Sequence, residues 1–337
     1  MTGTGKPFLD ASKGGIQKRT VSIAFCDDGV WARDFILRHL SAICDPRVVA
    51  ESEWRHTEVE IVFIGDGKGA QRKAFPHAKH VLFTTEDLYP DFSSYDYVVA
   101  YQCMDHPRYL RMPNWAVLVE PLQLIKSAQF ADTILAETRE FCAFVQSNGN
   151  PRRTRRRLEF FSALSQRRFV HSGGSVHNNL GYRVADIRQF LRGFQFMLCF
   201  ENNASPGYTT EKIINAILCG CIPIYWGDPE LYRDINPKAV VLVDSFKNDE
   251  AAIDHILEIS EKEELRRRYL EEPFFHQNQI PPIFDEQRIQ VFLSRIVYKP
   301  RPVRSLFSLS HRLFTWRRKM TPYLPGSFGG SGSPKQK

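Results

Sequence analysis

The sequence has 337 residues, enough for two domains of about 150 residues that each bury a core of their own. Hydrophobic residues make up 43% of it and aromatic residues 12%, which is typical of a globular protein, and no stretch approaches the 18 uncharged apolar residues of a membrane-spanning helix. The formal net charge of +7 favours anionic partners, such as nucleotide phosphates, an anionic membrane surface or nucleic acid.

The cysteines indicate a reducing compartment. Most of them lie in or beside apolar runs, and no pair has the C-x-x-C spacing of a zinc site. They are Cys26, Cys44, Cys103, Cys142, Cys199, Cys219 and Cys221. We therefore expect reduced thiols in the core of a cytoplasmic protein. The first 20 residues contain no apolar segment of the kind found in signal peptides, which agrees with this expectation.

The first half of the chain predicts a parallel sheet. Residues 1–19 are rich in Gly, Lys and Thr and predict a disordered lead-in. From residue 20 onward, apolar runs of strand length alternate with segments of helix length, as in α/β domains. The predicted strands cover residues 21–25, 60–64, 80–84 and 95–101, and the first predicted helix covers residues 31–44. A glycine cluster at 65–69 lacks the G-x-x-x-x-G-K-S/T pattern, so we interpret it as a turn rather than a phosphate loop.

A break in the pattern predicts the domain boundary. Residues 114–150 follow a mostly helical pattern that Asn148-Gly-Asn-Pro151 interrupts, and five arginines follow around Thr154. We therefore expect a first domain over residues 20–150 and a second over 151–297. Such an arginine run is most often a solvated basic linker.

Residues 196–227 predict a strand–loop–helix–strand unit. Apolar runs at 196–200 and 221–226 have the length of buried strands. Between them, a polar loop over 201–207 leads into a helix, and Gly220 lies where a glycine commonly ends one. In such a βαβ unit the working loop follows the carboxyl end of the first strand.

The first turn of this predicted helix carries Glu211 and Lys212. The partial positive charge of a helix start favours a glutamate there but not a lysine. A lysine in this place is explained if an anion binds between it and the exposed N–H groups, and phosphate is the usual anion. The alternative is a solvated lysine in an ordinary first turn.

The last part of the chain changes character. A strand is predicted at 240–243 and helices at 248–275, before a tail over residues 298–337. In residues 301–320, apolar side chains at i, i+3, i+7 and i+10 alternate with basic ones, which predicts an amphipathic helix on a membrane surface or one docked on the protein's own domains. Residues 322–337 predict disorder.

The run FENNASPGYTTEKIINAILCGCIPIYWG, residues 200–227, closely resembles the signature of the α-1,3/4-fucosyltransferases of glycosyltransferase family 10, especially the bacterial members. The resemblance extends upstream to LGYRVADIRQFLRGFQFMLCFEN and downstream to NPKAVVLVDSF, and more weakly into the first half, so that it covers most of residues 20–290. It implies an α/β fold of the GT-B type, with two Rossmann-like domains facing a cleft, the first on the acceptor side and the second binding GDP-fucose.

The resemblance also implies a catalytic base. The family uses a carboxylate that follows a strand of the first domain, and the matching residue is Glu86. Thr85 stands where bacterial relatives usually have glycine, and Asp87 follows directly, so Asp87 is the alternative base.

For the donor, the resemblance implies that Arg157, Glu201, Asn202, Tyr208, Glu211 and Lys212 bind GDP-fucose. Asn203 stands where the family usually has serine. Glu201 and Glu211 could instead cap backbone amides, a purely structural role. No Asp-x-Asp triplet occurs in the chain, so we expect Lys212 and Arg157, rather than a required metal, to neutralise the departing diphosphate; stimulation by a divalent metal stays open.

The implied reaction is an inverting transfer of L-fucose from GDP-β-L-fucose to a hydroxyl of an N-acetylglucosamine-type acceptor, in α-1,3 or α-1,4 linkage. A Lewis-type glycan or a lipopolysaccharide O-antigen would be the acceptor, and the enzyme would be cytoplasmic or peripheral on the inner face of the membrane. The alternatives are a transferase for another nucleotide sugar, an inactive sugar-nucleotide binder and a basic nucleic-acid-binding protein. The last is disfavoured because the basic clusters lie in a linker and a tail rather than across one face of a fold.

Overall fold

The computed structural model describes residues 18–26, 30–65 and 73–302. The predicted lead-in up to residue 17, most of the glycine cluster and the amphipathic tail from residue 303 lie outside the described residues. Within these described ranges, none of the helices is both long and apolar enough to cross a bilayer.

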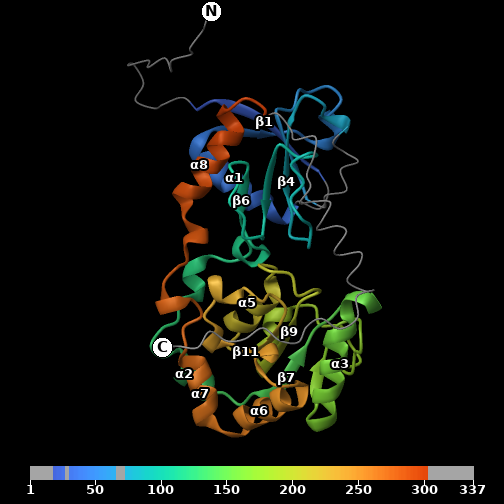
Figure 1. Cartoon of the computed structure of the whole chain (residues 1–337), viewed down its shortest axis with the longest axis vertical. Coiled ribbons are helices and arrows are strands. Elements are labelled where there is room, and N and C mark those ends of the chain that lie inside the picture. Colours follow the sequence, from blue (N-terminus) through green and yellow to red (C-terminus); the bar gives the residue numbers. More distant parts are fainter. Residues whose placement is uncertain (1–17, 27–29, 66–72, 303–337) are drawn as a thin grey trace, which may run out of the picture.

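The described chain forms two lobes, each built around a parallel sheet (Figure 1). The first sheet has the order β2-β1-β3-β4-β5-β6. Its strands are β1 (Thr20–Cys26), β2 (Asp45–Val48), β3 (Ile61–Ile64), β4 (Lys79–Phe83), β5 (Tyr97–Ala100) and β6 (Tyr109–Arg111). All four residues of β3 and of β5 are buried, as expected of strands covered on both faces.

The second sheet has the order β11-β10-β9-β7-β8, and all its pairings are parallel. Its strands are β7 (Glu140–Phe144), β8 (Val170–Ser172), β9 (Phe194–Phe200), β10 (Ile222–Trp226) and β11 (Val241–Leu242). The α-helices in the described ranges are α1 (Val30–Ile43), α2 (Phe130–Leu135), α3 (Pro151–Arg167), α4 (Ile187–Leu191), α5 (Glu211–Leu218), α6 (Asp249–Glu261), α7 (Glu263–Glu271) and α8 (Glu286–Tyr298).

The predicted βαβ unit is confirmed as β9, α5 and β10. On α5, Ile213, Ile214 and Ile217 form a buried face that packs into the core. Gly220 follows the helix with a φ of +74°, and a Cβ there would lie 2.3 Å from Cδ1 of Ile134. Both the left-handed backbone and the close contact require glycine at this helix end.

The predicted domain boundary at residue 151 does not coincide with the division between the sheets. Strand β7 pairs with β8 and β9, so residues 140–144 belong to the second sheet rather than to the first domain. The expected helical stretch at 114–150 therefore contains a strand, because an apolar run of five residues does not reveal by periodicity whether it is helix or strand. The arginine run after Pro151 is likewise not a linker but the start of α3.

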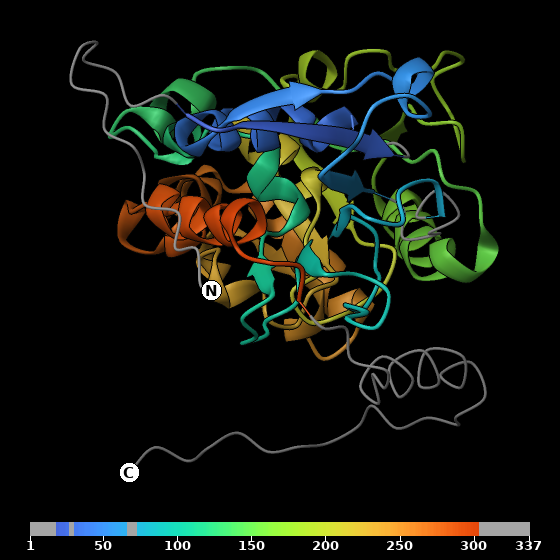
Figure 2. The ribbon, with the colours of Figure 1, turned by 90° about the horizontal axis from the view of Figure 1, so that it is seen from above.

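Helix α8, which lies within the predicted second domain, packs on the first lobe instead. Helix α8 lies beside α1 in both views of the molecule (Figures 1 and 2). Nζ of Lys79 in β4 donates to the carbonyl of Ile296 at 2.6 Å, and the hydroxyl of Tyr298 donates to the carbonyl of Ile43 at 2.7 Å. The chain thus completes the second lobe and returns to cover the first.

The two segments that connect the lobes lie side by side. The backbone N–H of Lys126 donates to Oδ1 of Asn278 at 3.0 Å, and Nδ2 of Asn278 donates back to the carbonyl of Lys126 at 2.9 Å. Nζ of Lys126 also donates to the carbonyls of Leu270 and Glu272, at 2.8 and 2.6 Å.

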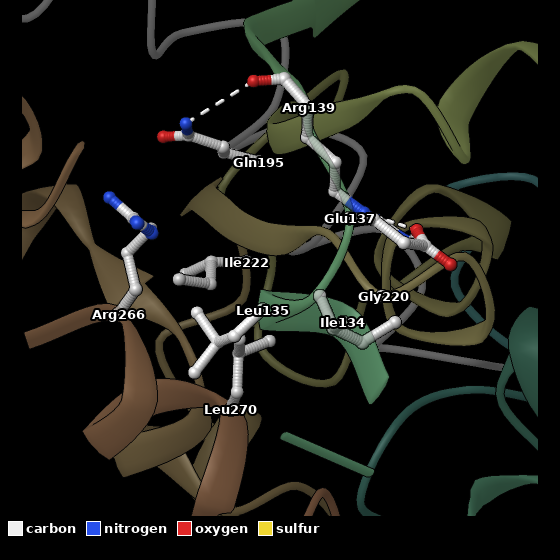
Figure 3. Close-up of a pocket in the computed structure, with 9 residues that line it drawn as sticks. All are labelled: Ile134, Leu135, Glu137, Arg139, Gln195, Gly220, Ile222, Arg266 and Leu270. Atoms are coloured by element: carbon white, nitrogen blue, oxygen red, sulfur yellow. Dashed lines mark hydrogen bonds and ion pairs between the residues drawn. The ribbon is translucent and has the colours of Figure 1, made fainter. Parts of the chain in front are cut away.

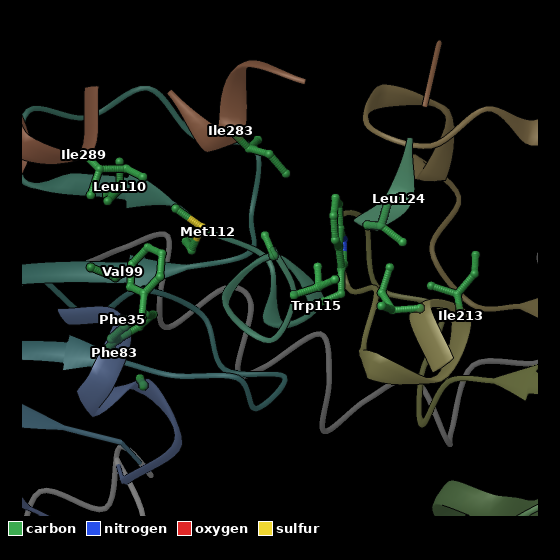
Figure 4. Close-up of a cluster of buried hydrophobic side chains, with 14 of the residues drawn as sticks. Phe35, Phe83, Val99, Leu110, Met112, Trp115, Leu124, Ile213, Ile283 and Ile289 are labelled. Carbon is green, nitrogen blue, oxygen red and sulfur yellow. The ribbon is translucent and has the colours of Figure 1, made fainter. Parts of the chain in front are cut away.

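One apolar core runs through both lobes. Figure 4 shows it extending from Phe35 and Phe83 in the first lobe through Met112 and Trp115 to Ile213 on α5. Trp115 is fully buried, and its ring lies against three phenylalanine rings of the returning segment, with centroid distances of 5.6 to 6.4 Å. Because burying apolar side chains is the main stabilising term in folding, this shared core holds the lobes at a defined separation.

Candidate functional site

The candidate site lies at the carboxyl edge of the second sheet. Glu201 directly follows β9, Gly227 directly follows β10, and Gln146 comes two residues after β7. Since β7, β9 and β10 run parallel, the residues that follow them meet at one edge of the sheet, where open α/β sheets bind their ligands.

Glu201 is fully buried at this edge and holds the start of α5. Its carboxylate accepts hydrogen bonds from the backbone N–H and the hydroxyl of Thr210, both at 2.7 Å, and from Nζ of Lys212 at 3.2 Å. Burial raises the pKa of Glu201, while the charge of Lys212 and the bonds from Thr210 oppose that rise. The structural capping role that the sequence left as an alternative is therefore present in Glu201.

Gly227 leaves the room that this carboxylate needs. A Cβ at residue 227 would lie 2.6 Å from Cγ of Glu201, closer than side-chain atoms approach one another. The glycine at the end of β10 is thus part of the packing around Glu201.

Lys212 is held between carboxylates rather than solvated. Its Nζ lies 3.2 Å from Oε2 of Glu201 and 3.5 Å from Oε1 of Glu211, and it donates to Oγ1 of Thr210 at 2.8 Å. Burial favours the neutral amine, but the two carboxylates outweigh it and raise the pKa of Lys212. The ammonium is therefore charged at neutral pH, and only 18% of the side chain is exposed.

Arg157 supplies a second buried cation, from α3. Its guanidinium donates to Oε1 of Gln146 and, at 2.7 Å, to Oδ1 of Asn202, while its buried Nε has no hydrogen-bond partner in the described part of the chain. Burial lowers the pKa of Arg157, and the charges of Glu201 and Glu211 oppose this. In contrast, the guanidinium of the neighbouring Arg156 pairs with Asp249 at 2.7 Å.

Tyr208 and Gly207 bring this edge into contact with the first lobe. The ring of Tyr208 lies against Tyr101 of the first lobe with a centroid distance of 5.1 Å. Gly207 has a φ of +82°, and a Cβ there would lie 2.8 Å from the carbonyl oxygen of Tyr101. Burial and the negative charges of Glu201, Glu86 and Asp87 raise the pKa of Tyr208.

Across the interface, Glu86 and Asp87 differ in their surroundings. Glu86 is exposed, and its backbone N–H donates to Oγ1 of Thr84 at 3.1 Å. Asp87 is buried, and its two carboxylate oxygens accept hydrogen bonds from the hydroxyl of Tyr101 and from Nδ2 of Asn203, the latter at 2.6 Å. Of the two candidate bases, Glu86 therefore has the more accessible carboxylate.

Asp228 also lies at this edge of the sheet and was not predicted from the sequence. Its buried carboxylate accepts from the N–H of Gly207 at 2.6 Å, from the hydroxyl of Thr209 at 3.0 Å and from the N–H of Glu230 at 2.7 Å. Burial raises the pKa of Asp228, and these hydrogen bonds oppose the rise. The signal was available, because Asp228 is the second residue after β10, at the same edge of the sheet as Glu201, the first residue after β9.

A pocket at the other end of the second sheet is separate from this site (Figure 3). Arg139, Gln195 and Ile222, which line it, lie just before or at the start of β7, β9 and β10. None of the candidate residues lines it. Among the residues that the structure describes, no three His, Cys, Asp or Glu side chains are grouped so that they could hold a metal ion.

Two parallel-sheet α/β lobes, with a polar site at the carboxyl edge of the second, define a fold of the GT-B class, as predicted. A solved Anabaena protein, Alr3699/HepE in complex with UDP and glucose, shares this fold, with a TM-score of 0.51 and 10% identity over 81% of this chain and 99% of that one. Residues 135–280 match the family model described as glycosyltransferase family 10 (fucosyltransferase), C-terminal. Residues 135–280 are thus similar to the C-terminal part of family 10 proteins, and the predicted resemblance is confirmed.

Two relatives extend this result. The alpha-(1,3)-fucosyltransferase FucT of Helicobacter pylori is 36% identical over 231 residues, which cover 58% of this chain and 48% of that protein. The chain therefore spans about half the length of this relative. A solved alpha1,3-fucosyltransferase with GDP-fucose superposes with a TM-score of 0.70 at 27% identity, covering 88% of this chain and 96% of that one.

Proposed function

We propose that the protein transfers L-fucose from GDP-β-L-fucose to a hydroxyl of an N-acetylglucosamine-type acceptor, forming an α-1,3 linkage. The observation that carries this proposal is the pair of buried cations, Lys212 and Arg157, beside the family 10 signature loop. The similar alpha1,3-fucosyltransferase was solved with GDP-fucose, which supports the choice of donor.

The cations suit the leaving group. As the bond to fucose breaks, negative charge develops on the diphosphate, and preorganised cations and helix N–H groups stabilise it most where water is excluded. Lys212 would act as a point charge at the start of α5, and Arg157 would present its guanidinium, whose Nε–H has no hydrogen-bond partner among the described residues. With these two cations in place we propose that no bound metal is required, so activity should persist in excess EDTA.

Glu86 is the proposed base. Its exposed carboxylate would take the proton of the acceptor hydroxyl, whose oxygen then attacks C1 of fucose from the face opposite the diphosphate. GDP leaves, and the β-linked donor gives an α-fucoside. A solvent-facing carboxylate on a backbone held by Thr84 supports this role better than the enclosed carboxylate of Asp87.

The test is a transfer assay with the purified full chain. GDP-fucose, GDP-mannose and UDP-glucose are each offered with N-acetyllactosamine and N-acetylglucosamine acceptors, and products are analysed by mass and linkage. We expect a fucosylated product with GDP-fucose and no transfer from GDP-mannose or UDP-glucose. Transfer from another nucleotide sugar, or DNA binding without any transfer, would refute the proposal.

The base is tested with Glu86→Gln, and Glu51→Gln serves as an exposed control in the same lobe. Removing a general base typically costs 10²–10⁴-fold in rate. We expect a loss of this order in Glu86→Gln, with the GDP affinity by calorimetry unchanged. Wild-type turnover in that variant would remove Glu86 from the mechanism.

We also propose that the acceptor is a Lewis-type glycan or a lipopolysaccharide O-antigen, modified at the inner face of a membrane. The basic and apolar spacing of residues 301–320 in the sequence supports peripheral binding to anionic lipid. Sedimentation with phosphatidylglycerol vesicles, and not with phosphatidylcholine vesicles, is the expected result.

A further inference from the structure

The carboxylate of Asp87 joins the two lobes beside the candidate site. The hydroxyl of Tyr101, in its own lobe, donates to one carboxylate oxygen, and Nδ2 of Asn203, in the loop after β9, donates to the other at 2.6 Å. Asp87 is 4% exposed, so these bonds form in a site with little access to water. A hydrogen bond to a buried carboxylate is stronger than one between neutral groups and costly to break.

Asp87 is also the residue next to Glu86. The backbone around Glu86 is fixed on both sides, because its N–H is bound to Thr84 and its carbonyl accepts from the N–H of Leu88 at 2.7 Å. The carbonyl of Leu88 in turn accepts from Nε2 of Gln102 at 2.6 Å. Anchoring the Asp87 carboxylate therefore helps to fix the backbone position from which the Glu86 side chain extends.

The loop that Asn203 belongs to is held from both lobes. On its own side, the buried Asp228 binds the N–H of Gly207 and the hydroxyl of Thr209. On the other side, the loop contacts the first lobe through Asp87 and through the packing of Tyr208 on Tyr101. The bond between Asp87 and Asn203 thus links the residue beside the proposed base directly to the loop beside the proposed donor cations.

We propose that Asp87 is a positioning residue, whose hydrogen bonds to Asn203 and Tyr101 set the separation between Glu86 and the donor loop. This role rests on the proposed function, because it assigns Asp87 a part in the same transfer. Its carboxylate does not take the acceptor proton; it acts through Glu86. An error of about 1 Å in the placement of reacting groups is enough to lower a rate about 10²-fold.

The test exchanges the two partners. Asn203→Asp places two carboxylates against each other, whereas Asp87→Asn combined with Asn203→Asp restores one carboxylate and one amide with the net charge of the wild type. Ala204→Asp, at an exposed neighbour, controls for the added charge on the loop. For each variant of the full chain, kcat and KM for GDP-fucose, GDP affinity and Tm are measured.

We expect Asn203→Asp to lower kcat by about 10- to 100-fold, the range set by one hydrogen bond to a charged group. The exchanged pair should recover kcat to within about fivefold of the wild type, and Ala204→Asp should lose less than about threefold, because a single exposed charge contributes little. KM for GDP-fucose and the affinity for GDP should change little in the exchanged pair, because Lys212 and Arg157 are untouched.

Two results would overturn the proposal. One is a wild-type kcat in Asn203→Asp. The other is an exchanged pair that recovers Tm but not kcat, since that would leave the contact with a structural role alone. A wild-type chain that binds GDP-fucose but transfers nothing would instead refute the proposed function, and the positioning role with it, while recovery of Tm in the exchanged pair would still report the contact between the lobes.

Discussion

Replacing Lys212 with methionine should destabilise the protein by leaving Glu201 as a buried anion without its cation. The Glu201 side chain is fully buried and Lys212 is 18% exposed, so the pair is screened little by water. Breaking a buried ion pair by removing one partner costs about 3–5 kcal/mol. Because Glu201 keeps two hydrogen bonds from Thr210, we expect the lower end, about 3 kcal/mol.

The stability lost in Lys212→Met should depend on pH in a defined direction. The pKa of Glu201 is already raised above the ordinary value of 4.5, and removing the charge of Lys212 would raise it further. A carboxyl group with a raised folded-state pKa contributes stability below its unfolded pKa and loses that contribution as the pH rises through the folded pKa. The stability gap between wild type and Lys212→Met should therefore be small near pH 4.5 and widen toward pH 8.

The assay is thermal unfolding followed by circular dichroism at pH 5, 6, 7 and 8. A loss of about 3 kcal/mol corresponds to a fall in Tm of about 6–12 °C for a domain of this size. Lys262→Met is the matched surface control, since Lys262 pairs with Glu258 at 2.8 Å while both side chains are about half exposed. That variant should shift Tm by no more than a few degrees, because exposed pairs contribute about 0–1 kcal/mol.

A second variant separates charge from packing. Glu201→Gln combined with Lys212→Met removes both charges and should recover much of the stability that Lys212→Met loses, because a neutral buried pair leaves no uncompensated ion. A Tm gap between wild type and Lys212→Met that is equal at pH 5 and pH 8 would refute this account of the pair.

Two further predictions concern Gly207 and Arg157. Gly207→Ala should lower Tm and kcat together, because its Cβ would meet the carbonyl of Tyr101 at 2.8 Å; Gly181→Ala has a similar φ of +78° but open space around it, so it should show the backbone strain alone. Equal losses in both would contradict the contact. Arg157→Met should weaken GDP binding by about 10- to 100-fold in calorimetry, the range of a hydrogen bond to a charged group, whereas Arg155→Met, on the exposed face of the same helix, should bind normally. An unchanged affinity in Arg157→Met would exclude it from the donor site.

The sequence was informative where one local pattern determined the outcome. The unit from Phe196 to Gly227 folds as predicted, because its strand runs, its helix stripe and the glycine at 220 all act within about 30 residues. Glu201 and Lys212 were both assigned to the donor site through the family resemblance, and the structure shows them 3.2 Å apart. Their donor-binding roles, and that of Arg157, remain predictions.

The features that the sequence did not predict depend on contacts between segments that lie far apart in the sequence. Strand β2, with the sequence DPRV, has too few apolar residues to be recognised, and it is held by pairing with β1. Helix α8 could not be assigned to the first lobe, because only contacts such as that between Tyr298 and Ile43, 255 residues apart, place it there. The bond between Asp87 and Asn203 is invisible for the same reason, since 116 residues separate them.

The two segments that connect the lobes are hydrogen-bonded to each other at Lys126 and Asn278, so cutting the chain once would not separate the lobes. Leu122, in the first of these connecting segments, is 73% exposed and offers a protease an accessible site. After such a cut, α8 would still cover the first sheet and keep the two fragments associated. Two adjacent tethers also define a single hinge axis, so any swing of one lobe relative to the other would bend around that line rather than twist freely.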